Sequence, residues 1–206
     1  MSFRTEEKIF LKRSDASKLK DFIFRNNGRS IYPNRNIKSI YFDNKNFQSF
    51  HDSEDGCTPR KKIRIRNYNN KNEFFLEKKI SSVEGKFKTS NRISYQDRLN
   101  YLQSDLFDST YGSCYPTVSV EYIREYYFLK DIRITIDYDM TYSSVKYKKI
   151  IKDTENLILE LKSKSINNYD FFLHTVPINR IRFSKYCTGI NLLGEIVEKT
   201  RYQLNI

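Results

Sequence analysis

The chain contains few of the residues and patterns that mark membrane, secreted or disordered proteins. No apolar run approaches the roughly 20 residues that a membrane-spanning helix needs, and the N-terminus has no apolar signal core. The three cysteines, Cys57, Cys114 and Cys187, form no CxxC pair, and the four prolines mark no hinge. We therefore expect a single domain over residues 1–206, in the cytoplasm, with reduced cysteines.

Acidic residues are too few to balance the basic ones. Lys and Arg number 37 against 25 Asp and Glu, which gives a net charge of +12. Such an excess destabilises a compact chain by self-repulsion unless a polyanion offsets it. Nucleic acid, an anionic membrane surface or a phosphate-rich small molecule would each do so, so the positions of the charges decide between them.

The hydrophobic pattern predicts an α+β protein with an antiparallel sheet. Alternating and β-branched segments predict strands over residues 3–11, 39–43, 61–66, 74–80, 87–94, 117–128, 131–138 and 157–164. Helices are predicted between Ser14 and Gly28, behind the N-cap Ser94 as far as Leu106, and from Ser184 toward Gly194. Asp137 and Asp139 are interpreted as turn residues that follow a strand.

Several of these strands carry charges on alternate residues, which share one face. The charged faces are Arg4/Glu6/Lys8, Lys62/Arg64/Arg66, Glu77/Lys79, Arg133 and Glu160/Lys162. For a single strand, a solvated outer face is the favoured interpretation. Taken together, the faces predict a closed antiparallel barrel of about eight strands, with flanking helices, whose tunnel collects them.

Such a tunnel would have the chemistry of a phosphate-binding site. Arg and Lys bind phosphoryl oxygens through charge-assisted hydrogen bonds, each contributing roughly 1.5–3 kcal/mol. The carboxylates of Glu6, Glu77 and Glu160 would repel phosphate unless each pairs with a cation or holds a metal. Hard oxygen ligands beside phosphate suit Mg²⁺ or Mn²⁺. For Glu77, pairing with cations inside the tunnel is favoured over metal binding.

Eight short motifs, in order along the chain, resemble the VTC domain, the polyphosphate polymerase branch of the triphosphate tunnel metalloenzymes, in its stand-alone bacterial form. They are Arg4-Thr-Glu6-Glu-Lys8, Ser39-Ile-Tyr-Phe-Asp43, Lys62-Ile-Arg64-Ile-Arg66, Leu76-Glu77-Lys-Lys79, Tyr122-Ile-Arg124, Ile132-Arg133-Ile-Thr-Ile-Asp137, Leu159-Glu160-Leu-Lys162 and Phe183-Ser-Lys185-Tyr186. The resemblance implies a tunnel that binds ATP or another triphosphate and polyphosphate, with Mn²⁺ or Mg²⁺ as cofactor.

The charged faces and the resemblance together predict the site residues. The predicted substrate-binding residues are Arg4, Lys8, Lys62, Arg64, Arg66, Lys79, Lys88, Arg92, Arg124, Arg133, Lys162, Arg182 and Lys185. The residues predicted to be catalytic are Lys8, Arg64, Arg66, Lys79, Arg133, Glu160 and Lys185. Glu160 is the predicted metal ligand, with Glu6 as a second one. Lys88 and Arg92 match the family's spacing only loosely.

The substrate and reaction stay open at this point. Arg4 occupies the place where the hydrolytic relatives carry the first glutamate of a Glu-x-Glu-x-Lys signature, which favours the polymerase branch. An inorganic or nucleoside triphosphatase of the same fold is the alternative, and a polyanion-binding module without catalysis is another. Nucleic acid is not the expected partner, because alternation confines many basic residues to an interior. A membrane-protein partner that exports the product stays undetermined.

Overall fold

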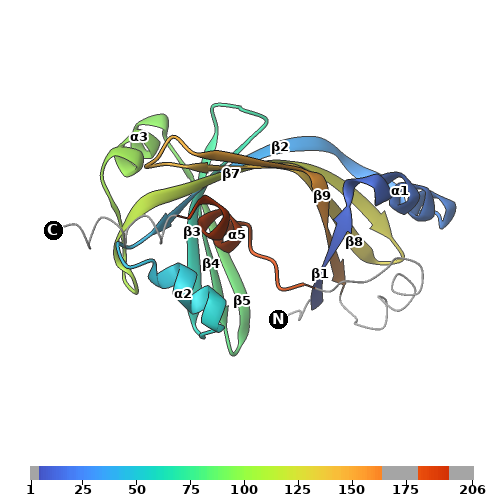
Figure 1. The fold of residues 1–206 in the computed structure, drawn as a ribbon. Helices are drawn as coiled ribbons and strands as arrows, with labels where there is room; N and C mark the ends of the chain where they lie inside the picture. The colour runs from blue at the N-terminus through green and yellow to red at the C-terminus, as the bar shows by residue number, and fades with distance from the viewer. Residues whose placement is uncertain (1–4, 164–180, 195–206) are drawn as a thin grey trace. The chain divides into compact units, whose positions relative to one another are not determined.

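The computed structural model describes residues 5–163 and 181–194, in which runs of consecutive strands are separated by helices (Figure 1). The predicted site residue Arg4 lies outside the described residues. The strands are β1 (Thr5–Lys12), β2 (Arg29–Asp43), β3 (Arg60–Tyr68), β4 (Phe74–Ser82), β5 (Gly85–Ile93), β6 (Leu106–Asp108), β7 (Gly112–Leu129), β8 (Ile132–Ser144) and β9 (Ile150–Ser163). The helices are α1 (Ala16–Arg25), which follows a 3₁₀ turn (Arg13–Asp15), α2 (Gln48–Asp55), α3 (Tyr95–Gln103) and α5 (Lys185–Leu193).

The strands form one sheet, and the predicted α+β class is confirmed. The hydrogen-bonded order is β1-β9-β8-β7-β2-β3-β4-β5, with β6 paired to β7 beside this path. Within the described residues the two ends of this order, β1 and β5, do not pair with each other, so the sheet is open and the expected closed barrel is not confirmed. Backbone of the segment before α5 contacts β1 instead, since the Ile181 N–H donates to the Lys8 carbonyl at 3.0 Å.

The chain divides into two compact units. Unit 1 comprises Met1–Asn36, Tyr122–Met140 and Lys152–Phe183, and unit 2 comprises Ile37–Glu121, Thr141–Ile151 and Ser184–Ile206. The long strands β2, β7, β8 and β9 contribute residues to both units. The prediction of one domain over the whole chain stays a prediction.

The core of unit 1 lies between α1 and one face of its strands. Leu19 and Ile23 of α1 are buried against Ile9, Ile134 and Leu159 of three strands, and Phe22 packs at the edge, so the predicted helical stripe is confirmed. These strand residues alternate with the charged ones, which therefore lie on the face away from α1. Burial of the apolar face fixes which side of the strands the charges occupy.

The core of unit 2 is built on the β3–β4 hairpin and on α3. The hairpin is confirmed, with Ile63 and Ile65 buried in the core. The capping box of α3 is confirmed as well, since the Ser94 side chain accepts from the Asp97 N–H while the Asp97 side chain accepts from the Ser94 N–H. Leu106 does not continue the helix as predicted. It lies in β6, where it pairs with β7 and is buried in this core.

Two further helices complete unit 2, and in Figure 1 α2 and α5 lie close to each other. Helix α5 begins after Ser184, which accepts from the Cys187 N–H, and ends at Gly194, as predicted. Gly189 lets the helix approach the sheet, because a Cβ there would lie 2.9 Å from Val118 of β7. Among the described residues, no helix is long and apolar enough to cross a membrane.

Candidate functional site

Apart from Lys185 of α5, the predicted site residues of unit 2 lie on one face of β3, β4 and β5. This face continues onto Ser39 and Tyr41 of β2, and we call it the basic face. The strand register aligns them in rows: Lys62 with Lys79 and Lys88, Arg64 with Glu77 and Ser90, and Arg66 with Phe75 and Arg92. Like charges directly opposite each other destabilise a sheet. A row of three lysines across neighbouring strands therefore indicates a surface that an anion stabilises.

Glu77 is the carboxylate at the centre of the basic face, and its side chain is 2% exposed. Its Oε2 atom accepts from Arg64 Nε at 2.8 Å, and its Oε1 atom accepts from Lys88 Nζ at 2.7 Å. Arg66 Nη1 lies 3.5 Å from Oε2. Burial alone would raise the pKa of Glu77, but the positive charges of Arg66, Arg64 and Lys88 outweigh it and lower the pKa to about 2. The predicted pairing of Glu77 with cations is thus what the geometry shows.

The arginines of the basic face are held by hydroxyl groups of β2. Arg64 Nη1 donates to Tyr41 Oη at 3.0 Å, and Arg66 Nε donates to Ser39 Oγ at 3.1 Å. The Tyr41 ring stacks on Tyr186 of α5, with centroids 5.3 Å apart. Burial opposes ionisation of Tyr41, but the nearby charges of Arg64 and Arg66 dominate and lower its pKa. The two guanidinium groups are therefore fixed in orientation before any ligand binds.

Asp43 connects this face to the starts of α2 and α5. Tyr186 Oη donates to Asp43 Oδ2 at 2.5 Å, and the backbone N–H groups of Ser49 and Phe50 donate to the same carboxylate. Burial raises the pKa of Asp43 despite these hydrogen bonds. Lys62 Nζ donates to Ser184 Oγ at 2.9 Å, at the N-terminus of α5. The structure thus places Lys62 beside the helix that carries the predicted residue Lys185.

Five of the predicted site residues of unit 1 form a second group together with Asp137. This group, the carboxylate cluster, consists of Glu6, Lys8, Arg124, Asp137, Glu160 and Lys162. In the β1–β9 ladder Glu6 is opposite Lys162 and Lys8 is opposite Glu160, so opposite charges alternate along both strands. Lys162 Nζ lies 2.7 Å from Glu160 Oε1, and Arg124 Nη2 lies 3.7 Å from Glu160 Oε2. Side chains of β1, β7 and β9 thus meet at the buried carboxylate of Glu160.

The ionisation of Glu160 follows from these contacts. Burial would raise its pKa, but Arg124, Lys162 and Lys8 outweigh it and hold the pKa well below the usual value. Lys8 is oriented by its neighbours, because its Nζ donates to the Phe183 carbonyl at 2.8 Å and lies 3.7 Å from Glu6. Glu160 is therefore a fully charged carboxylate at neutral pH.

Asp137, which the sequence pattern indicated to be a turn residue, positions Arg124. Arg124 Nη2 donates to Asp137 Oδ2 at 2.6 Å, and Arg124 Nε donates to Oδ1. Asp137 is fully buried within β8, so its interpretation as a turn residue is wrong. Its alternation with Arg133 and Thr135 was the signal that could have revealed its role. Asp139 lies within the same strand.

Some of the predicted residues lie outside these contacts. Arg133 is exposed on β8, with its guanidinium 6.0 Å from the centre of the Tyr126 ring. Arg92 is exposed and pairs with Glu73. Arg182 is exposed beside Phe183 in unit 1, while Lys185 belongs to unit 2. Their assignment as substrate ligands stays a prediction.

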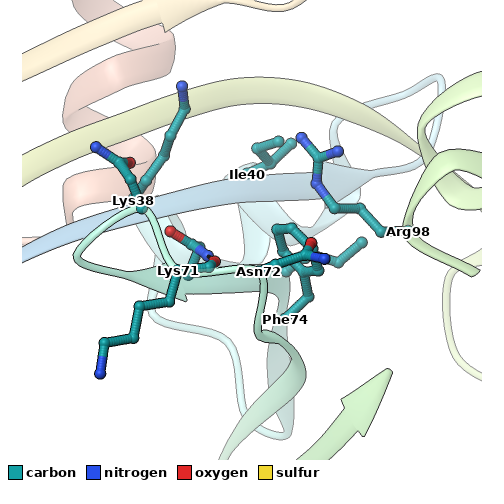
Figure 2. Close-up of a pocket in the computed structure, with 9 residues that line it drawn as sticks. Lys38, Ile40, Lys71, Asn72, Phe74 and Arg98 are labelled. Atoms are coloured by element: carbon teal, nitrogen blue, oxygen red, sulfur yellow. Dashed lines mark hydrogen bonds between the residues drawn. The ribbon is translucent and has the colours of Figure 1, made fainter. Parts of the chain in front are cut away.

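A separate cavity of about 230 Å³ lies on the opposite side of β2 and β3 from the basic face (Figure 2). Ile40 and Ile65 line it, and they alternate with Tyr41 and Arg64 of the basic face. The other lining residues are Lys38, Asn67, Asn70, Lys71, Asn72, Phe74 and Arg98. None of the predicted site residues lines this cavity.

Comparisons with known proteins agree with the architecture. The family model described as the VTC domain matches residues 3–194. Among solved structures, a proposed adenylate cyclase from Bacillus halodurans has 14% sequence identity and a TM-score of 0.62, covering 90% of this chain and 96% of that one. A proposed adenylyl cyclase from Hippeastrum, described as having a dominant triphosphatase activity, has 12% identity and a TM-score of 0.58, with coverage of 91% and 96%.

A protein from Pyrococcus horikoshii has 15% identity and a TM-score of 0.55, covering 92% of this chain and 99% of that one. At these identities the likeness concerns the fold. A search of curated proteins finds no match.

Proposed function

The chain belongs to the VTC domain family, and from this premise we propose that it is a metal-dependent phosphotransferase acting on a triphosphate. In its most specific form, the proposal is a polyphosphate polymerase that uses ATP. The observation that carries it is the basic face, where six cations share one side of neighbouring strands with a single central carboxylate. These cations are Lys62, Arg64, Arg66, Lys79, Lys88 and Arg92.

The residues of the basic face have the chemistry of phosphate ligands. Arg64 and Arg66 present planar forks that match two phosphoryl oxygens, and the lysines supply point charges along the same face. Because Glu77 already occupies part of both arginine forks, a phosphate chain binds beside this carboxylate. Phosphoryl transfer asks a protein mainly for positioning and charge neutralisation, which these residues supply.

The carboxylate cluster fits a divalent metal that is bound partly by the protein and partly by the substrate. Glu160 and Glu6 lie on the same face of the β1–β9 ladder, two residue pairs apart. Within residues 5–163 and 181–194 no group of three metal-binding side chains occurs. Mg²⁺ is commonly held by one or two carboxylates together with substrate phosphates and water, so two glutamates suffice. When bound, the metal supplies neutralisation of charge on the phosphoryl oxygens.

The proposed transfer needs no general base. The terminal phosphate oxygen of a polyphosphate chain is already anionic, so it forms a bond to the γ-phosphorus of ATP without losing a proton. The bond between the γ-phosphorus and the β-γ bridging oxygen breaks, ADP leaves with that oxygen, and the chain is one phosphate longer. Lys8, Arg124 and Lys162 are the cations of unit 1 that offset negative charge near Glu160.

A triphosphatase is the second candidate function. In that case water replaces the phosphate nucleophile and orthophosphate is released. The triphosphatase activity described for the Hippeastrum protein of similar fold favours this candidate. Arg4 favours the polymerase, because the resemblance implies a glutamate at this position in the hydrolytic relatives.

The test is incubation of the protein with ATP and Mn²⁺ or Mg²⁺, followed by gel separation of phosphate chains and measurement of orthophosphate. Chains longer than the primer support the polymerase, and orthophosphate without chains supports the triphosphatase. Glu160→Gln is expected to lower metal-dependent turnover at least 100-fold while inorganic tripolyphosphate still binds, because the cations stay in place.

A matched control is Glu155→Gln, which removes an exposed carboxylate from the same strand β9. It is expected to keep the wild-type rate. Equal activity of wild type and Glu160→Gln would contradict the assignment of the metal ligand. Tripolyphosphate binding without turnover in any metal would leave a polyanion-binding module instead of an enzyme.

A further inference from the structure

Unit 1 contains a group of aromatic and arginine side chains that the proposed chemistry does not use. The Tyr32 ring of β2 meets the Tyr126 ring of β7 edge-on, with centroids 5.5 Å apart. The Arg35 guanidinium lies 5.3 Å from the centre of the Tyr32 ring and 5.4 Å from that of Tyr126. The guanidinium of Arg133 on β8 lies 6.0 Å from the centre of the Tyr126 ring. We call these four residues the aromatic–arginine cluster.

This cluster lies on the same strand face as the carboxylate cluster. Tyr126 follows Arg124 by two residues on β7, and Arg133 precedes Asp137 by four residues on β8. Side chains two or four residues apart on a strand point to the same side, about 7 or 13 Å apart. A ligand whose phosphates reach Arg124 would therefore extend along this face of β7 and β8 toward Tyr126 and Arg133.

Thr135 lies between the two clusters on β8, and its hydroxyl group lacks a partner. The residue is 5% exposed, and its Oγ1 atom has no hydrogen bond within the described part of the chain. Buried hydroxyl groups in folded proteins nearly always have a partner. Because Thr135 alternates with Arg133 and Asp137, the unsatisfied hydroxyl lies on the face that the two clusters share.

The exposed parts of the aromatic–arginine cluster suit a nucleobase. Tyr32 is 47% exposed, although its ring is held by Tyr126 and Arg35, so part of the ring is open for stacking. Arg133 is exposed and has no carboxylate partner among residues 5–163 and 181–194. Base stacking on tyrosine, together with neighbouring arginines, is a common way of binding nucleotides without base-specific hydrogen bonds.

We propose that the aromatic–arginine cluster binds the base and ribose of a nucleoside triphosphate, so that the protein distinguishes this substrate from inorganic tripolyphosphate. The inference rests on the proposed function, because it takes those phosphates of the substrate that contact the metal to lie at the carboxylate cluster. Thr135 Oγ1 is then the buried group that a ribose hydroxyl satisfies. The stacking interaction predicts a preference for nucleotides in general and no strong choice among bases.

The test compares the affinities of ATP and inorganic tripolyphosphate by isothermal titration calorimetry, with wild type, Tyr32→Ala and Tyr32→Phe. Tyr32→Ala is expected to weaken ATP binding about tenfold and to leave tripolyphosphate binding unchanged. Tyr32→Phe keeps the ring and is expected to bind ATP like wild type. Phe107→Ala, at an aromatic residue that is 75% exposed in unit 2, is the matched control and is expected to change neither affinity.

A second readout is the fluorescence of 2-aminopurine riboside triphosphate, which stacking on Tyr32 quenches. Wild type and Tyr32→Phe are expected to quench it, and Tyr32→Ala is expected to quench it much less. Unchanged ATP affinity in Tyr32→Ala, or equal weakening of both ligands, would overturn the inference while the proposed function stands. Failure of wild type to bind either ligand would overturn both.

Discussion

Replacing Glu77 by glutamine tests whether this carboxylate serves as the internal counter-ion of the basic face. Its pKa falls from 4.5 to about 2 in the folded protein, because Arg66, Arg64 and Lys88 outweigh the effect of burial. A shift of this size corresponds to about 3 kcal/mol of folding free energy at pH 7. Glu77→Gln keeps the shape of the side chain but leaves three cations without their carboxylate. We expect the free energy of unfolding to fall by about that amount.

The stabilising effect of Glu77 is expected to depend on pH. Since the folded-state pKa of Glu77 lies below 4.5, its stabilising effect is complete above about pH 4.5 and is lost as the pH falls toward 2. The difference in unfolding free energy between wild type and Glu77→Gln is therefore expected to shrink to roughly 1.5 kcal/mol at pH 3. Urea denaturation followed by circular dichroism at both pH values measures it, because the chain lacks tryptophan.

Glu73→Gln is the control for this experiment. Glu73 also pairs with an arginine, at 3.2 Å from Arg92, but both side chains are largely exposed. Exposed ion pairs contribute about 0–1 kcal/mol, so this variant is expected to unfold nearly like wild type. Inorganic tripolyphosphate is expected to stabilise Glu77→Gln more than wild type, since the ligand replaces the missing charge. A Glu77→Gln variant as stable as wild type, with no pH-dependent difference, would refute the counter-ion role.

Two further predictions concern the side chains that orient the charged residues. Arg124→Lys cannot keep both hydrogen bonds to the buried Asp137, so the free energy of unfolding is expected to fall by about 1–3 kcal/mol in urea denaturation. Tyr186→Phe removes the donor to Asp43, whose pKa burial already raises, so its pKa is expected to rise further and stability at pH 7 to fall by about 1–3 kcal/mol. The loss of unfolding free energy in Tyr186→Phe is expected to be smaller at pH 5, where a larger fraction of Asp43 is protonated and needs no donor. A loss that does not change with pH would contradict this role of Tyr186.

The sequence predicts well those parts of the fold that depend on neighbouring residues. The alternation around Ile63 and Ile65 predicts a strand and the side on which its charges lie, and the cap at Ser94 predicts where α3 begins. Strand lengths are less well predicted. β2 begins at Arg29, ten residues before the predicted start, because its first half is mostly polar and exposed and gives no alternating signal.

The partners of the site residues depend on strand register, which the sequence does not contain. Arg124 was predicted as a phosphate ligand, but only the structure shows that Asp137 orients it. The pair Asp137 and Asp139 is typical of a turn, yet β8 passes through both positions, with Asp139 at a φ of 51°. Lys88, which matches the family only loosely, lies opposite Lys79 and contacts Glu77. Strand pairing across the sheet therefore outweighs the local preference of Asp137 and Asp139 for a turn.

The buried carboxylates of Glu77 and Glu160 differ in their contacts, and the difference favours Glu160 as the metal ligand. Both oxygens of Glu77 accept short contacts, from two nitrogens of Arg64 and from Lys88, and Arg66 lies close as well. Glu160 has one short contact, with Lys162, whereas the Arg124 nitrogen lies 3.7 Å away because Asp137 holds the guanidinium. A metal ion at Glu160 has to replace only the flexible Lys162 side chain. A metal ion at Glu77 would also have to separate this carboxylate from the fixed Arg64 guanidinium. Since the pKa of Glu160 is already low, no proton has to leave at neutral pH, so binding of Mn²⁺ or Mg²⁺ is expected to depend little on pH above about 6.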